Sequence, residues 1–111
     1  MKKTVSILLS LLIAFQAFAI DYKATVWGAK SDGITDNTGS IQRAVDYIAG
    51  HGGGSLTFFV GRYVTGAIEL KSNVTIRIEE GAVLVGSDNI YAHKGAPALL
   101  WAKDAENIEV S

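Results

Sequence analysis

Three aspartates, Asp32, Asp36 and Asp46, lie close together in the stretch 28–48. Paired carboxylates are a common basis of acid–base catalysis, and an inverting glycosidase holds its two carboxyl groups about 6.5–9.5 Å apart. The neighbouring residues favour structural roles, because Asp32 precedes Gly33 in a turn-rich run and Asp36 precedes a predicted helix. We interpret Asp32 as a turn former, Asp36 as a helix cap and Asp46 as a solvated helix residue, so no catalytic residue is predicted here.

Metal and cofactor chemistry find little support in the sequence. An EF-hand loop that begins at Asp32 would need glycine at its sixth position and an acidic residue at its twelfth. Asn37 and Arg43 occupy these positions, so the match fails. The glycine-rich run 50–54 lacks the Gly-Lys-Ser/Thr ending of a phosphate-binding loop. His51 and His93 are isolated in polar loops, where solvent exposure is expected. We predict no metal site and no cofactor.

Aromatic and basic residues are the remaining candidates for ligand contacts. Tyr63 follows a glycine turn within a strand and is expected in the core, whereas Tyr91 and Trp101 flank the loosest segment and stay open as ligand contacts. Basic side chains at outward positions could meet the carboxylates of a ligand, but solvation is the default expectation; they are Arg62, Lys71 and Arg77. Asn73 fits a glycosylation sequon, and entry into a strand explains it better.

The element that must position Asp36 and Asp46 is a helix predicted over Thr38 to Ala49. Its apolar residues recur at helical spacing and form one stripe: Ile41, Ala44, Val45, Ile48 and Ala49. Asp36 or Asn37 can cap its start, and Gly50 stands where a left-handed C-cap residue is expected.

Short strand patterns dominate the rest of the chain. A first strand is expected at Lys23 to Trp27, and further ones follow, at 56–60, 63–65, 67–70, 74–78, 82–85, 99–101 and 107–110. The Asn-Gly or Asp-Gly turn of a hairpin is missing between the strands after residue 54. A faint repeat, 34 residues apart, joins 73–76 to 107–110, which suggests stacked parallel coils. A two-sheet sandwich fits the strands about as well.

The first 19 residues have the layout of a bacterial secretory signal peptide. Lys2 and Lys3 precede an apolar run at 5–15, and Ala17-Phe18-Ala19 supplies small residues for cleavage after Ala19. The apolar run is short of the about 20 residues that span a bilayer. We expect a secreted or periplasmic protein with no membrane segment after cleavage.

Residues 20–111 would then form the mature chain. Removing Lys2 and Lys3 from the 10 basic residues leaves 8 against 11 acidic residues, a net charge of −3. This balance argues against a nucleic-acid partner. The chain also has no cysteine, and small exported domains without disulfides or metals rarely bury enough surface. We expect residues 20–111 to be the incomplete beginning of a larger domain.

Motifs that run through residues 22–111 carry a family resemblance. They are Gly28-Ala29-Lys30, Asp32-Gly33, Thr35-Asp36-Asn37-Thr38, Ile41-Gln42, Ala44-Val45-Asp46, Gly52-Gly53-Gly54, Gly61-Arg62-Tyr63, Thr65-Gly66, Leu70-Lys71-Ser72-Asn73-Val74-Thr75 and Glu80-Gly81-Ala82-Val83-Leu84. Together they resemble the N-terminal segment of the pectate lyase superfamily, and their order is most similar to the polygalacturonase family, glycoside hydrolase family 28. Phe59 stands where that family usually has proline, so the strand before it is expected to run on.

The resemblance implies an all-β fold: the N-terminal coils of a right-handed parallel β-helix with an N-terminal capping α-helix. It implies a secreted polygalacturonase-like hydrolase that cleaves pectic polysaccharide with inversion and without a cofactor. The family's catalytic motifs lie in later coils and are missing from this chain, so these residues alone are expected to be inactive. The alternatives are a polysaccharide lyase or epimerase of the same superfamily, and a non-catalytic β-helix surface protein.

Overall fold

The computed structural model describes residues 20–88 and 99–111. These residues form one α-helix, one 3-10 helix and nine short strands in the described parts of the chain. In chain order the elements are β1 (Ile20–Lys23), η1 (Ala24–Trp27), β2 (Asp32–Asp36), α2 (Thr38–Gly50), β3 (Gly54–Phe58), β4 (Gly61–Thr65), β5 (Ile68–Leu70), β6 (Val74–Ile78), β7 (Ala82–Gly86), β8 (Leu100–Ala102) and β9 (Glu109–Val110).

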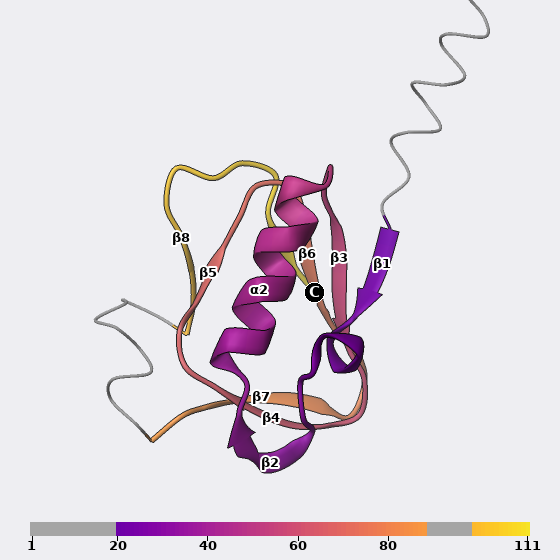
Figure 1. The fold of residues 1–111 in the computed structure, drawn as a ribbon, viewed down its shortest axis with the longest axis vertical. Helices are drawn as coiled ribbons and strands as arrows, with labels where there is room; N and C mark the ends of the chain where they lie inside the picture. Colours follow the sequence, from indigo (N-terminus) through magenta and orange to yellow (C-terminus); the bar gives the residue numbers. More distant parts are fainter. Residues whose placement is uncertain (1–19, 89–98) are drawn as a thin grey trace, which may run out of the picture.

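Strands that follow one another along the chain enter different sheets (Figure 1). The first sheet has the order β1-β3-β6-β9, the second β2-β4-β7 and the third β5-β8. Each of the six pairings in the described residues is parallel. Each turn of the chain therefore stacks on the preceding turn. This arrangement confirms the prediction of parallel coils over the two-sheet sandwich.

Side chains in register stack inside the coils. Tyr22 pairs with Leu56, Leu56 with Ile76, and Ile76 with Val110, so one apolar column runs through four strands of the first sheet. Leu56 is fully buried and Ile76 nearly so. Since alternate residues of a strand face opposite sides, the even positions of β3 and β6 point into the core. The alternation predicted at 74–78 is confirmed.

The asparagine repeat has a structural cause. Asn73 and Asn107 adopt φ values of 66° and 57°, the left-handed region that asparagine tolerates better than most residues. The Asn107 amide donates to Asn73 Oδ1 at 3.1 Å. Both residues precede strands of the first sheet, so each turns the chain into the same sheet one coil apart.

Two expectations at the start of the chain were wrong. Of the predicted strand at 23–27, only Lys23 lies in a strand, at the end of β1; the other residues form the 3-10 helix η1, which buries Ala24 and leaves Val26 exposed. The loop expected before the helix contains β2, which pairs with β4. The cause is tertiary: η1 packs against β3 and α2, and this contact outweighs the strand propensity of Thr25 and Val26.

Helix α2 begins at the predicted residue and buries four of the five residues of the predicted stripe, Ile41, Ala44, Val45 and Ile48, whereas Ala49 is half-buried. Its end differs from the prediction, because Gly50 is still helical and the left-handed conformation lies at Gly52 and Gly53. The Gly53 N–H donates to the Ile48 carbonyl at 2.8 Å, which satisfies one of the free carbonyls at the helix end. The helix therefore ends one residue later than expected, and the left-handed residue comes two positions later.

The strand before Phe59 does not run on, since β3 ends at Phe58 and Phe59 is exposed. The Tyr63 hydroxyl donates to the Phe59 carbonyl at 2.9 Å, and the Tyr63 ring meets the Phe58 ring edge-on at 5.1 Å. The prediction that Tyr63 lies in the core is confirmed. These contacts turn the chain between β3 and β4 without the proline.

Candidate functional site

Asp32 organises the turn that its neighbours predicted. Its carboxylate accepts hydrogen bonds from the Ile34 and Thr35 backbone N–H groups at 2.9 and 2.8 Å, and from the Thr35 hydroxyl at 2.7 Å. The Thr35 hydroxyl is the main cause that lowers the pKa of Asp32 from 3.8 to about 2. The ionised carboxylate is thus held by its own turn, and this suits it poorly to act as a general acid near neutral pH.

We expect the Asp32 carboxyl to titrate with a pKa of about 2, below the unperturbed 3.8. Because the folded-state pKa is lowered, the contribution of this carboxylate to stability is present above the unfolded pKa and is lost as the pH falls through the folded value. An NMR titration of the side-chain carboxyl measures this. Thr35→Val should move the pKa back toward 3.8, and an unchanged pKa in this variant would contradict the assignment.

Asp36 and Asp46 also make local contacts. The Asp36 carboxylate accepts the Thr38 backbone N–H at 3.0 Å and the Thr38 hydroxyl, at the first residue of α2. Asp46 is exposed on α2 and accepts the Gln42 amide at 3.1 Å. The interpretations of Asp36 as a helix cap and Asp46 as a solvated helix residue agree with these contacts.

Asn37 has a role that the sequence did not reveal. Its side chain does not cap α2; it accepts from the Lys30 N–H at 2.8 Å and donates to the Lys30 carbonyl at 2.9 Å. Only 1% of Asn37 is exposed, so this two-bond pair satisfies a buried amide. The Asn37 backbone N–H donates to the Val64 carbonyl at 2.8 Å. Asn37 therefore joins the loop before β2 to the start of α2 and to β4.

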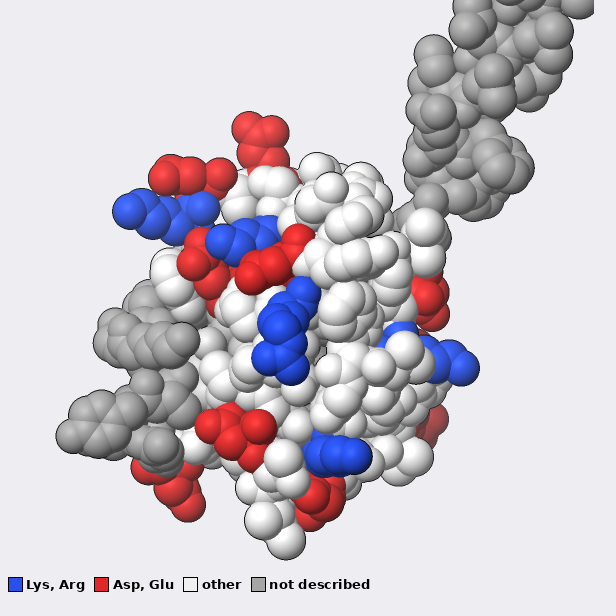
Figure 2. All heavy atoms as spheres, viewed as in Figure 1, with Lys and Arg blue, Asp and Glu red and all other residues white. Residues whose placement is uncertain are grey.

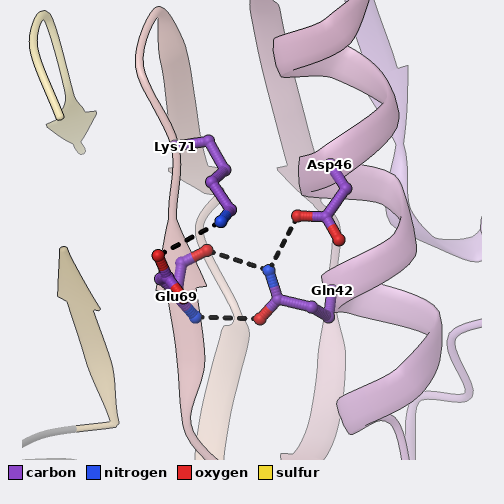
Figure 3. A network of polar contacts seen from close by, with 4 residues as sticks. All are labelled: Gln42, Asp46, Glu69 and Lys71. Atoms are coloured by element: carbon purple, nitrogen blue, oxygen red, sulfur yellow. Dashed lines mark hydrogen bonds and ion pairs between the residues drawn. The ribbon is translucent and has the colours of Figure 1, made fainter. Parts of the chain in front are cut away.

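A polar network joins α2 to β5 (Figure 3). The Gln42 amide donates to the Glu69 backbone carbonyl at 2.9 Å, and its oxygen accepts from the Glu69 backbone N–H at 2.9 Å. One side chain thus supplies both hydrogen bonds that a neighbouring strand would make with β5. Lys71 contacts the Glu69 carboxylate at 3.1 Å in a partly exposed ion pair. The Gly66 N–H, just before β5, donates to the Thr38 hydroxyl at 2.6 Å.

The candidate basic residues differ in their surroundings. Arg62 and Arg77 are exposed on β4 and β6, as expected for solvated strand positions. Arg62 also packs its side chain against Gly33 of the neighbouring strand. Within the described part of the chain, Lys71 forms a partly exposed ion pair with Glu69 at 3.1 Å, unlike the two arginines.

His51 belongs to an aromatic cluster that the sequence did not reveal. Its ring stacks on Tyr47 with centroids 3.8 Å apart, and its Nδ1 lies 2.8 Å from the Tyr47 carbonyl oxygen. Tyr47 also contacts Trp27 at 4.9 Å and Tyr22 at 6.1 Å between ring centroids. The i, i+4 spacing of Tyr47 and His51 was the available signal. Trp27 and Tyr22 come from other elements, and no local pattern joins them to the helix.

Among the residues that the structure describes, the other aromatic candidates lie outside this cluster. Trp101 is half-buried in β8, and Tyr91 and His93 lie outside the described residues. Within residues 20–88 and 99–111, no group of three or more acidic, histidine or cysteine side chains is placed to hold a metal ion. No helix of these same residues is long and apolar enough to cross a membrane.

Comparison with characterised proteins gives two kinds of relative, and no protein-family model matches. An exo-poly-alpha-D-galacturonosidase of Dickeya chrysanthemi is 46% identical over 65 residues, which cover 59% of this chain and 10% of that protein. A mannuronan C5-epimerase of Azotobacter vinelandii is 32% identical over 68 residues, 61% of this chain and 7% of the epimerase.

Two solved structures are similar over most of this chain. A candidate glycosyl hydrolase from Parabacteroides merdae has a TM-score of 0.79 and 60% identity, covering 82% of this chain and 41% of that one. The family 28 exopolygalacturonase of Yersinia enterocolitica has a TM-score of 0.71 and 29% identity, covering 85% and 20%. The chain therefore spans less than half the length of these relatives.

The stacked parallel strands define the described residues as part of a parallel β-helix. Within this class, the chain is similar to the polygalacturonases of glycoside hydrolase family 28, and the resemblance predicted from the sequence is confirmed.

Proposed function

We propose that this chain is the exported N-terminal part of a polygalacturonase-like glycoside hydrolase, with residues 1–19 as its signal peptide and 20–111 as the first part of the β-helix domain. The similarity to the Dickeya galacturonosidase and to the Yersinia exopolygalacturonase supports this proposal. Pectic polysaccharide is the substrate that these relatives suggest. The protein would meet it outside the cytoplasm.

The reaction would be hydrolysis of a galacturonosyl linkage with inversion, which needs one carboxylic acid to protonate the leaving oxygen and carboxylates to activate water. Asp32 and Asp36 hold a turn and a helix start, and Asp46 accepts a hydrogen bond from Gln42. The catalytic carboxylates would then come from further coils of the full-length protein. No cofactor is part of this mechanism.

The proposed role of residues 20–111 is to start and close the β-helix, which we take to be right-handed. The observation that carries this role is the pairing of Gln42 with the backbone of β5. In the first turn, β1 and β2 occupy the first two sheets, and α2 packs against β5, the first strand of the third (Figure 1). A helix in the place of a strand covers an edge that would otherwise expose unpaired backbone groups and core.

An assay of the exported full-length protein on polygalacturonate tests the activity. We expect new reducing ends of inverted configuration and no unsaturated sugar. An unsaturated product would show a lyase instead. Absence of cleavage of polygalacturonate and other pectic polymers would contradict the hydrolase.

A polysaccharide epimerase is the second candidate, because the Azotobacter epimerase matches 61% of this chain. Its identity of 32% is lower than the 46% of the galacturonosidase. An epimerase would invert C5 of the uronate residues of its polymer and leave the chain length unchanged, so proton NMR of the treated polymer separates the two reactions.

A further inference from the structure

The aromatic cluster of Tyr22, Trp27, Tyr47 and His51, here called the aromatic platform, is partly open to solvent. Tyr47 lies at its centre and keeps 42% of its surface exposed, although three other rings contact it. His51 is exposed, and Tyr22 and Trp27 are half-buried. We propose that the aromatic platform, together with Arg43, binds an acidic oligosaccharide of the uronate class.

The platform lies on the side of α2 that does not pack into the core. Arg43, Tyr47 and His51 follow one another at intervals of four residues and are all exposed. Side chains at this spacing are neighbours on a helix surface, with about 5–6 Å between Cβ atoms. The buried stripe of α2 uses other positions, which are Ile41, Ala44, Val45 and Ile48. The three exposed side chains are therefore available to a ligand.

The chemistry of these groups matches a charged sugar. Aromatic rings offer flat apolar faces, and the phenol, indole and imidazole groups add polar atoms at their edges. Sugars present apolar C–H faces and hydroxyl groups together, so this mixed surface suits them better than a purely apolar partner. The Arg43 guanidinium, 3.4 Å from the Ser40 hydroxyl, adds a cation that can pair with a carboxylate.

Other parts of the same face are more highly charged. Figure 2 shows acidic and basic groups on several parts of this face, whereas the surface between the upper part of α2 and β1 is largely uncharged. Tyr22 belongs to β1, which is the outer strand at one end of the first sheet, while β9 lies at the other end. The platform would therefore be separate from coils that add to β9. The aromatic platform would bind the pectic polymer at a distance from the catalytic groups of later coils. This inference rests on the proposed function.

Binding at the platform can be measured at one residue. His51 is one of only two histidines in the chain, so a His51→Gln variant assigns its imidazole NMR signal. We expect tetragalacturonate to shift this signal saturably in the full chain, and neutral galactotetraose to bind several-fold more weakly. Tyr47→Ala should weaken tetragalacturonate binding roughly tenfold, in the range of one lost aromatic contact. Arg43→Gln should weaken it several-fold and leave galactotetraose binding unchanged.

Matched controls are available on the same chain. Phe59 is as exposed as Tyr47, at 43% against 42%, and Arg77 is another exposed arginine. Phe59→Ala and Arg77→Gln should therefore leave tetragalacturonate affinity unchanged. The affinity of Tyr47→Ala for tetragalacturonate is measured by calorimetry. A circular dichroism melt of the same variant should confirm that its fold is intact.

Three results would overturn the inference. These are the absence of a His51 shift, equal affinity of wild type and Tyr47→Ala, or equal affinity for the charged and neutral sugars. Activity of the full-length protein on polygalacturonate, set beside the His51 shift, distinguishes the two proposals. Hydrolysis without a His51 shift would contradict uronate binding at the aromatic platform and leave the hydrolase proposal intact. A saturable shift without hydrolysis would contradict the hydrolase proposal and leave binding at the platform intact.

Discussion

Replacement of Gly53 by alanine is expected to destabilise the fold by about 3 kcal/mol or more, the sum of backbone strain and overpacking. Gly53 has a φ of 91°, which side chains with a Cβ rarely adopt. A Cβ placed on Gly53 would lie 2.5 Å from the Asn73 carbonyl oxygen, and this atom cannot move away freely because it accepts the Gly54 N–H at 3.0 Å. The backbones of two successive coils approach each other here.

Thermal unfolding followed by circular dichroism measures this effect. For a cooperatively unfolding unit of about 60–100 residues, 3 kcal/mol corresponds to a fall in the melting midpoint of about 12–24 °C. Gly50→Ala is the matched control, because Gly50 is helical and has open space where the Cβ would go. It should raise the free energy of unfolding by about 0.5–1 kcal/mol. Equal effects of the two substitutions would contradict the close approach of the coils.

Gln42→Ala is expected to lower the free energy of unfolding by about 2 kcal/mol. The variant loses both hydrogen bonds to the Glu69 backbone. The N–H and carbonyl groups of Glu69, which is half-buried, are then left without these partners. Helix propensity works in the opposite direction, since alanine is the best helix former, so it cannot explain a loss. The loss would measure how much α2 stabilises the edge of β5.

Two further variants separate this edge from the rest of the network. Asp46→Ala removes the carboxylate that also contacts Gln42 but keeps both bonds to Glu69, so it should cost less than about 0.5 kcal/mol. Gln42→Glu retains an acceptor for the Glu69 N–H and loses the donor to the Glu69 carbonyl. We expect it to be destabilising as well. If Gln42→Ala melted like Asp46→Ala, the pairing of Gln42 with β5 would not be the contact that attaches the helix.

The sequence predicted the local features of the fold well where one element decides them. The buried stripe of α2 and the alternation at 74–78 follow from periodicity, and the repeat at Asn73 and Asn107 marks equivalent positions in successive coils. The turn role of Asp32 follows from its neighbours, because its hydrogen-bond partners lie within three residues. The same stretch contributed some of the motifs of the family resemblance, which run through residues 22–111.

Contacts between distant segments decided the rest. The strand formers at 25–26 became a 3-10 helix because η1 packs against α2 and β3, and β2 formed because β4 offered it a partner. Gln42 looked like an ordinary polar helix residue until β5, 27 positions later, presented its backbone. The aromatic platform likewise joins three elements.

The sequence by itself determined which segments alternate, which turn, and which family the chain resembles, because these properties depend on residues a few positions apart. Only the tertiary structure decided which helix residue takes the place of a strand and which rings meet on the surface. Such contacts depend on how one coil lies on the next, and backbone and aromatic groups that meet across coils leave no fixed spacing in the sequence.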